Sequence, residues 1–572
     1  MPCRFVSGSC AGEVLPTWRA RLLGPDGLRL DQWIGSGQAR LIKHSPRRAV
    51  YRVDAADEPF FVKHYRCPRW WQALGHLFRH TPSRREFRRA QATLERNVPT
   101  VEPLAWVESR RAGVPRDSFL VTRAVAGSCA LDEFLRTVLP KIERAAAARL
   151  RRKLAISLAR LCAVAHREGL DHDDLHAGNV LVRVDSCQAT VGDERLPELF
   201  LIDLPGVRLS RTLNRRRTLA SLTMLGAACS SWATTSDMVR FLRAYLAERP
   251  DLQRCDWREL VRRLARGIPP RIRRIARDRD QRALRTNRDF YRLSTARATG
   301  RAVADCSREQ LSALVDVPHE PIAENSHRPY KLSHRSIVVR AELELDTGTT
   351  PVAYKRVRPR NWWKTFLHYF RRNPAVDAWH YGHALLLRGI ATARPLAVVE
   401  RKRVGLPAEG YLATQWICGA KNLHVYGWEL VDRPPAERRR RTRQVCQALG
   451  RLLGRMHSWH VSHRDLKGCN ILLVERADDV ECYLIDADSV WIPRRLWPFF
   501  RAFNLGRLAT SVEAHGWVTR GDRLRFLRAY LAELRRRDPA AWPADWKQGW
   551  RAVAKATRTI VGRLRRNGRE IV

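Results

Sequence analysis

The segment His463-Arg-Asp-Leu-Lys-Gly-Cys-Asn470 is followed by an apolar run and then by Leu484-Ile-Asp486. The same arrangement occurs earlier in the chain, where His172-Asp-Asp-Leu-His-Ala-Gly-Asn179 precedes an apolar run and Leu201-Ile-Asp203. In both segments an aspartate and an asparagine lie five residues apart. One such match could arise by chance, but two at corresponding places in one chain indicate an internal repeat.

Both segments resemble the catalytic loop of protein kinases, H-R-D-L-x-x-x-N, and the metal-binding aspartate that follows it. Phosphoryl transfer depends mainly on positioning and charge neutralisation, so one carboxylate orients the acceptor hydroxyl and takes its proton. A second carboxylate and an amide oxygen hold magnesium against the phosphates. The candidate bases are Asp174 and Asp465, and the candidate magnesium ligands are Asn179, Asp203, Asn470 and Asp486.

Each copy also needs a lysine on a strand that binds the α- and β-phosphates of ATP. Lys63 and Lys355 end aligned β-rich runs, and the chain has only 12 lysines, which favours a phosphate-binding function over ordinary surface positions. Glu86 is expected to pair with the lysine of the first copy. The second copy has Ala378 at the ungapped equivalent, with Asp377 beside it, so either Asp377 substitutes or this copy is weak or regulatory.

The repeat covers about half of the 572 residues per copy. Residues 63–108 align without gaps on residues 355–400 with 17 identities, and Phe241–Glu248 recurs unchanged as Phe526–Glu533. In each copy, short β-rich runs come first and helical patterns follow. Glycine and proline residues in the region from about 290 to 328 indicate a loop between the two copies. The expected organisation is a first domain at 1–300, a linker at 301–328 and a second domain at 329–572.

The motifs resemble those of the bacterial lipopolysaccharide core kinases, which phosphorylate heptose or Kdo sugars and share the protein-kinase fold. The resemblance covers nearly the whole chain twice and includes Lys43–Arg52 and the aligned segments Phe119–Gly127 and Tyr411–Gly419. It implies an α+β fold of two tandem bilobal protein-kinase-like domains, each with a small β-rich N-lobe and a larger helical C-lobe. It also implies ATP and Mg²⁺ as cofactors and a sugar hydroxyl of a lipid-linked saccharide as acceptor.

Two alternatives remain at this point: an atypical Ser/Thr protein kinase, and a scaffold in which one or both domains are pseudokinases. Neither Asp203 nor Asp486 is followed by the Ala-Pro-Glu anchor with which peptide-directed kinases build their substrate platform. This absence favours a sugar acceptor over a protein.

The formal charge of +47 implies attraction to polyanions, namely nucleic acid, an anionic membrane or phosphorylated substrates. The arginine runs at 438–441 and 563–569 lack interleaved aromatic residues, so a nucleic-acid partner is not expected. Trp70-Trp71 and Trp362-Trp363, each followed by aromatic and basic residues, fit either a membrane interface or packing inside the N-lobe. We expect peripheral contact with an anionic membrane.

The 13 cysteines are scattered without metal-site spacing, which favours a reducing cytosol over a disulfide framework or a zinc site. No signal peptide and no apolar stretch of membrane-spanning length is visible in the sequence. These features predict a cytoplasmic protein, in peripheral contact with the inner face of the cell membrane.

Overall fold

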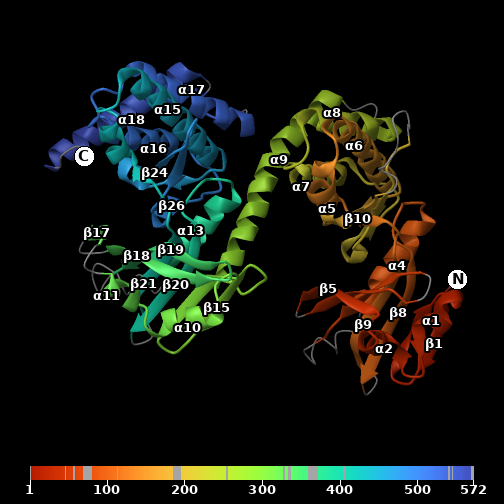
Figure 1. Ribbon diagram of the computed structural model, residues 1–572. Coiled ribbons are helices and arrows are strands. Elements are labelled where there is room, and N and C mark those ends of the chain that lie inside the picture. Colours follow the sequence, from red (N-terminus) through yellow and green to blue (C-terminus); the bar gives the residue numbers. More distant parts are fainter. Residues whose placement is uncertain are drawn as a thin grey trace. The chain divides into compact units, whose positions relative to one another are not determined.

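The computed structural model divides the chain into two compact units, Met1–Ile272 and Arg273–Val572 (Figure 1). Each unit contains both helices and strands, as the α+β expectation requires. The residues that the structure describes are 2–45, 47–55, 58–67, 80–111, 114–184, 195–252, 256–325, 329–332, 336–358, 372–403, 406–538, 541–543 and 545–568.

The first unit begins with a seven-stranded antiparallel sheet in the order β1-β2-β8-β9-β7-β6-β5. Helix α4 (Pro82–Glu95) packs against β8 and β9. The strands of the sheet are β1 (Cys3–Ser7), β2 (Cys10–Val14), β5 (Ala39–Ser45), β6 (Arg48–Val53), β7 (Phe60–Tyr65), β8 (Pro103–Arg111) and β9 (Val114–Arg123).

The rest of the first unit is mainly helical and has its own hydrophobic core, separate from the core of the sheet. A three-stranded sheet of β10 (Ser128–Ala130), β12 (Val180–Arg183) and β13 (Leu199–Leu201) lies within it. A second pair joins β11 (Leu170–Asp171) to β14 (Arg208–Leu209). Its main helices are α6 (Arg144–Arg167), α7 (Arg215–Cys229), α8 (Thr235–Ala247) and α9 (Trp257–Asp280), the last of which contains the division between the units.

The second unit repeats this order with a seven-stranded sheet, β15-β16-β20-β21-β19-β18-β17, against which α13 (Pro374–Leu387) packs. Its strands are β15 (Phe290–Ser294), β16 (Ala298–Val303), β17 (Lys331–Leu332), β18 (Ser336–Leu345), β19 (Gly348–Val357), β20 (Pro395–Arg403) and β21 (Leu406–Gln415). A three-stranded sheet again follows, formed by β22 (Lys421–Asn422), β24 (Ile471–Glu475) and β25 (Val480–Leu484).

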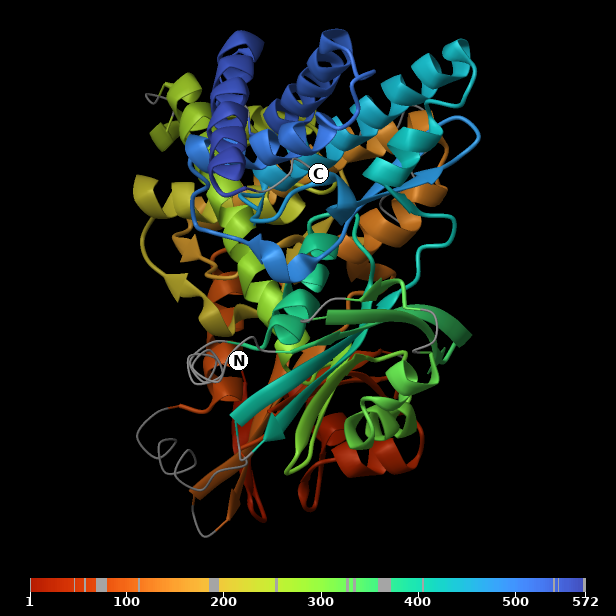
Figure 2. The ribbon, with the colours of Figure 1, turned by 90° about the vertical axis from the view of Figure 1, so that its left-hand side faces the viewer.

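The helical part of the second unit follows the sheet in sequence, and its blue helices occupy a different part of the unit from the green strands in Figure 1 and again in Figure 2. One hydrophobic core nevertheless runs through the whole unit. Its helices are α14 (Leu423–Glu429), α15 (Pro435–Ser458), α16 (Pro498–Val512), α17 (Arg520–Arg537) and α18 (Trp546–Arg566).

The long helices form because apolar residues recur every three or four positions and so share one face. The buried positions of α6 include Leu150, Leu154, Leu158, Leu161 and Ala165. The repeated Phe-Leu-Arg-Ala-Tyr-Leu-Ala-Glu segment lies on α8 and on α17, and both helices begin with a Thr–Asp capping box. The two copies therefore use the same start signal for the same helix.

The expected boundary and linker differ from the structure. Residues 273–300 belong to the second unit, and the segment expected to be a linker forms the end of β16, α10 (Arg308–Asp316) and α11 (Glu320–Glu324). Leu311, Leu314 and Ile322 from this segment are buried in the core of the second unit. The segment is folded because its apolar side chains cover the sheet.

None of the described helices combines the length and the apolar character that crossing a bilayer requires.

Candidate active sites

In the first unit, three elements bring Lys63, Glu86 and Asp203 together. Lys63 lies on β7, Glu86 lies on α4, and Asp203 follows β13. The Lys63 ammonium lies 2.6 Å from the Glu86 carboxylate and 3.2 Å from that of Asp203. Glu86 is only 2% exposed, so the pair is shielded from water. A lysine held in this way by two carboxylates has a fixed position for binding phosphate.

Arg48 and Tyr65 complete this cluster, and the sequence motifs did not reveal them. The Arg48 guanidinium lies 3.1 Å from the Asp203 carboxylate, and the Tyr65 hydroxyl donates a hydrogen bond to Glu86. Burial alone would raise the pKa of Asp203, but the positive charges of Lys63 and Arg48 outweigh it and hold the pKa below its ordinary value. Asp203 is therefore ionised near neutral pH.

The catalytic loop of the first unit is held by hydrogen bonds that run through His172 and Asn179. The His172 ring contacts the Ile202 carbonyl oxygen at 3.2 Å and accepts a hydrogen bond from the Asp174 amide at 3.2 Å. The Asn179 side chain donates to the Asp174 carbonyl oxygen at 2.9 Å. The Asp174 side chain itself is 71% exposed. The backbone of the loop is therefore fixed, while the Asp174 carboxylate stays accessible. A catalytic base needs this accessibility to contact the hydroxyl group of a substrate.

The second unit holds its lysine differently. The Lys355 ammonium lies 2.5 Å from the Asp486 carboxylate and 3.8 Å from that of Asp488. Burial alone would lower the pKa of Lys355, but Asp488 and Asp486 raise it above its ordinary value. A second carboxylate is thus present, but it comes from the turn after Asp486 and not from α13.

Asp377, one candidate substitute for the missing glutamate, does not pair with Lys355 in the part of the chain that the structure describes. Its carboxyl is half-buried, and this burial raises its pKa to about 6, although the nearby positive charges of Arg372 and Arg464 act in the opposite direction. Ala378 is buried on the same helix. Asp488 was not singled out from the sequence, although the short pattern Asp-Ala-Asp at 486–488 contains it.

The catalytic loop of the second unit shares two of the hydrogen bonds of the first. The His463 ring contacts the Ile485 carbonyl oxygen at 3.0 Å, and the Asn470 side chain donates to the Asp465 carbonyl oxygen at 2.8 Å. Lys467 lies 3.1 Å from the Asp465 carboxylate, which is 48% exposed. Both candidate bases are therefore on the surface of their loops.

Each metal-ligand candidate of the Asp type adopts an unusual backbone conformation. Asp203 has φ of 61° and Asp486 has φ of 66°, in the left-handed region that residues with a Cβ seldom adopt. Threonines tie the preceding strands in place: Thr100 donates to the Leu201 carbonyl oxygen at 2.7 Å, and Thr392 to that of Leu484 at 2.6 Å. The same strained turn is built twice, which points to a shared function.

The donor set at these turns fits magnesium. The backbone amides of Ile202 and Ile485 donate to the carbonyl oxygens of Asn179 and Asn470, which brings each asparagine next to its aspartate. In the described ranges no three His, Cys, Asp or Glu side chains form a cluster that could hold a metal alone. Mg²⁺ is commonly held by one or two carboxylates together with substrate phosphates, so an aspartate and an amide oxygen suffice.

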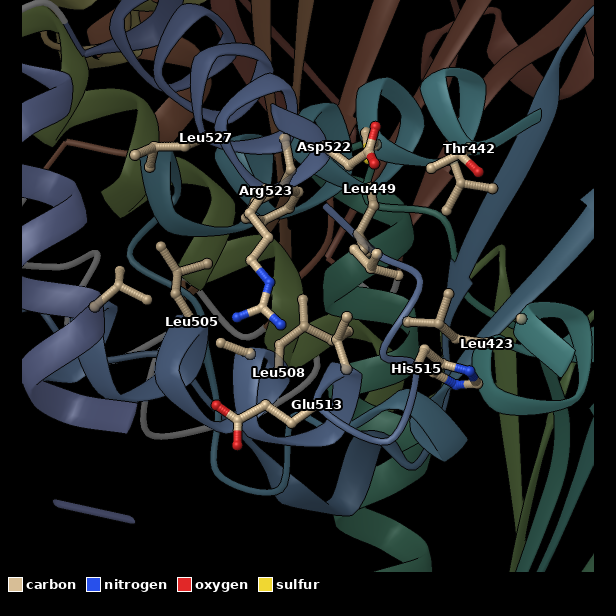
Figure 3. Close-up of a pocket in the computed structure, with 18 of the residues that line it drawn as sticks. Leu423, Thr442, Leu449, Leu505, Leu508, Glu513, His515, Asp522, Arg523 and Leu527 are labelled. Atoms are coloured by element: carbon tan, nitrogen blue, oxygen red, sulfur yellow. The ribbon is translucent and has the colours of Figure 1, made fainter. Parts of the chain in front are cut away.

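A separate apolar cavity of about 340 Å³ lies among α14, α15, α16, α17 and α18 of the second unit. Figure 3 shows the Arg523 side chain directed into it between Leu505 and Leu508. None of the catalytic-loop residues lines this cavity. A chain of contacts nevertheless connects them, from His515 through His424 and Ser511 to the amide of Gly468.

The tryptophan pairs Trp70-Trp71 and Trp362-Trp363 lie outside the described residues. Arg48, which contacts Asp203, is the first residue of β6 and pairs with Ser45 at the end of β5.

Comparison with known proteins supports the resemblance seen in the motifs. The heptose(I) kinase WaaP of the lipopolysaccharide core from Pseudomonas aeruginosa is 30% identical over 161 residues, which are 27% of this chain and 59% of the relative. The 3-deoxy-D-manno-octulosonic acid kinase of Pasteurella multocida is 30% identical over 156 residues, 26% of this chain and 60% of the relative. That of Haemophilus influenzae (strain 86-028NP) is 25% identical over 135 residues, 23% and 52% respectively.

The chain thus spans 52% to 60% of the length of these curated relatives. A solved structure of WaaP in complex with acyl carrier protein has 22% sequence identity and a TM-score of 0.31, and the match covers 46% of this chain and 97% of that one. The model of the lipopolysaccharide kinase (Kdo/WaaP) family matches residues 32–245 in the first unit and 360–530 in the second. Since the family model matches both repeats and more than half of the sequence, this chain belongs to the lipopolysaccharide kinase (Kdo/WaaP) family.

Proposed function

We propose that this protein is an ATP- and Mg²⁺-dependent kinase that phosphorylates a sugar hydroxyl of a lipid-linked saccharide of the lipopolysaccharide-core type. The reaction would take place at the cytoplasmic face of the membrane, with the protein bound peripherally. Each unit is proposed to be a bilobal protein-kinase-like domain. The observation that carries the proposal is the lysine–aspartate contact in both units, Lys63 with Asp203 and Lys355 with Asp486, beside a loop with a base and an asparagine.

In the first unit, the proposed roles follow from the contacts. Lys63, held by Glu86, binds the phosphates of ATP, and Asn179 and Asp203 hold the metal. Mg²⁺, when bound, supplies positive charge that stabilises the phosphates during transfer. Asp174, exposed on its loop, orients the sugar hydroxyl and accepts its proton. The ion pair between Arg48 and Asp203 fixes the carboxylate that would hold the metal.

In the second unit, Asp465 is the proposed base, and Asn470 and Asp486 are the proposed metal ligands. We assign to Asp488 the task that Glu86 has in the first unit, because it is the second carboxylate beside Lys355. Its burial and its distance from the lysine support a positioning role. With this substitution the second unit has a full set of groups for phosphoryl transfer.

The test uses the full chain with ATP labelled on the γ-phosphate and with membranes that contain lipid-linked core saccharide. Label should appear in the extracted lipid-linked saccharide, whereas an atypical protein kinase would label protein. Asp174→Ala and Asp465→Ala should each reduce the labelling, and the double variant should abolish it. Asp432→Ala, at an exposed aspartate outside both loops, is the matched control. Labelling that survives the double variant would have to come from another enzyme in the membranes. This protein would then have only a scaffold function, and the proposal would be overturned.

A further inference from the structure

A group of large aromatic side chains is exposed directly after the second unit's turn with Asp486. Trp491, Trp497 and Phe499 are 37%, 54% and 59% exposed, and the intervening Arg494 and Arg495 are exposed as well. We call these five residues the aromatic–arginine patch. Single exposed apolar residues are ordinary, but several large ones together mark a surface that binds something.

The patch combines rings with positive charge at close range. The Arg495 guanidinium lies 4.4 Å from the centre of the Trp497 ring, and Phe499 packs against Phe500 and Phe503 with ring centres 5.6 Å and 4.3 Å apart. No aspartate or glutamate occurs between residues 489 and 512. A partner that binds this surface must therefore offer apolar groups for the rings and negative charge for the arginines.

The patch is fixed beside the catalytic loop. Strand β26 (Val490–Trp491) pairs with β23 (Ser462–His463), so that Trp491 lies opposite the residue before His463. The His460 ring contacts the Arg494 carbonyl oxygen at 2.9 Å. A surface that rests on the patch would thus lie near the loop with Asp465.

The first unit differs at the same place. An offset of 283, which relates Asp203 to Asp486, sets Arg208 opposite Trp491, Asn214 opposite Trp497 and Arg216 opposite Phe499. This segment of the first unit is basic but carries none of the aromatic residues. The aromatic component is therefore a property of the second copy and not of the repeat as such.

We propose that the aromatic–arginine patch binds the surface of an anionic phospholipid bilayer. Aromatic rings rest at the level of the headgroups, while arginines interact with anionic lipids. Binding through this patch would bring the second unit's catalytic loop to the membrane surface. This consequence for catalysis rests on the proposed function, because only a lipid-linked acceptor would be presented there, whereas vesicle binding does not depend on it.

Sedimentation of the full chain with vesicles tests the proposal. Vesicles of phosphatidylcholine with one quarter phosphatidylglycerol should bind the protein, and vesicles of phosphatidylcholine alone should bind it weakly. Trp497→Ser/Phe499→Ser should weaken binding about tenfold, since two rings no longer leave water. Serine is a favoured N-cap, and Trp497 is the N-cap of α16, so Trp497→Ser keeps a residue suited to the start of this helix. Arg494→Gln/Arg495→Gln should weaken binding about twentyfold, and high salt should act in the same direction.

The matched control is Trp257→Ser, which removes a tryptophan that is 48% exposed in the first unit. It should bind like the unaltered protein. Equal binding by Trp497→Ser/Phe499→Ser, an equal loss with Trp257→Ser, or no binding to anionic vesicles at all would each overturn the proposal. Asp465→Ala should still bind vesicles, and Trp497→Ser/Phe499→Ser should keep its activity on a water-soluble, delipidated saccharide. Failure of the proposed function is thereby distinguished from failure of membrane binding.

Discussion

Asp488→Asn tests whether the second unit has moved the carboxylate that positions its lysine. In the first unit, Lys63 lies between Glu86 and Asp203; in the second, Lys355 lies between Asp486 and Asp488. Asparagine keeps the size of the side chain and removes its charge. The lysine would then have one carboxylate partner, the one proposed to hold the metal.

The size of the effect follows from the 3.8 Å between the Lys355 ammonium and the Asp488 carboxylate. At an effective dielectric constant of about 20, two unit charges at this distance attract each other by about 4 kcal/mol. Both side chains are about one-fifth exposed, at 21% and 23%, so water compensates part of the loss. A net loss of about 1.4 kcal/mol corresponds to about a tenfold decrease in kcat/KM for ATP.

The assay is done in an Asp174→Ala background, in which only the second unit turns over. Asp488→Asn should lower kcat/KM for ATP about tenfold, and Ala378→Glu in the same chain should restore most of it. The rescue is expected because α13, which carries Ala378, packs against the turn that carries Asp488. Unchanged kinetics for Asp488→Asn, in a protein with an unchanged unfolding midpoint, would refute the reasoning.

Asp174→Asn and Asp465→Asn should each lower turnover by their own unit by about 10²- to 10⁴-fold, with ATP affinity measured by equilibrium binding left unchanged. Asp280→Ala should lower the free energy of unfolding of the second unit by about 3–5 kcal/mol in urea, because it leaves a buried arginine unpaired. The exposed Asp278→Ala should have no such effect. Burial lowers the pKa of His457 to about 3, so the unfolded chain binds more protons below pH 6.5. Stability should therefore fall as the pH decreases, by about 2 kcal/mol from this group at pH 5, and His457→Gln should remove that part of the pH dependence in urea unfolding.

The repeat and the order of strands and helices could be predicted from the sequence, because both depend on local patterns. The boundary could not. Gly300 looked like loop punctuation, yet it lies inside β16, where a Cβ would come within 2.5 Å of Val315 on α10. Pro321 looked like a turn residue, yet it lies in the first turn of α11, a position that proline favours. Glycine occurs in loops but also where elements pack closely, and proline occurs in turns but also at the start of helices. These two residue types alone therefore do not identify a linker.

The catalytic loops could be predicted because their residues are close in sequence. The partners from distant segments could not be predicted. Arg48 contacts Asp203 only because the fold brings two distant segments together, and no motif in the sequence indicates this contact. Asp377 was a reasonable substitute in a linear alignment. On a helix, however, adjacent side chains point about 100° apart, so a shift by one residue directs the carboxylate elsewhere. Asp488 lies beside Lys355 instead, because it follows Asp486 in the same turn.

The left-handed backbone at Asp203 and Asp486 has an evolutionary consequence. Glycine would adopt this conformation without strain, so replacing either aspartate by glycine would relieve about 1 kcal/mol. In an inactive copy, only the ion pairs of the aspartate with Lys63 and Arg48, or with Lys355, would oppose that gain. In an active copy the need for a carboxylate would oppose it as well, and both copies keep the strained aspartate.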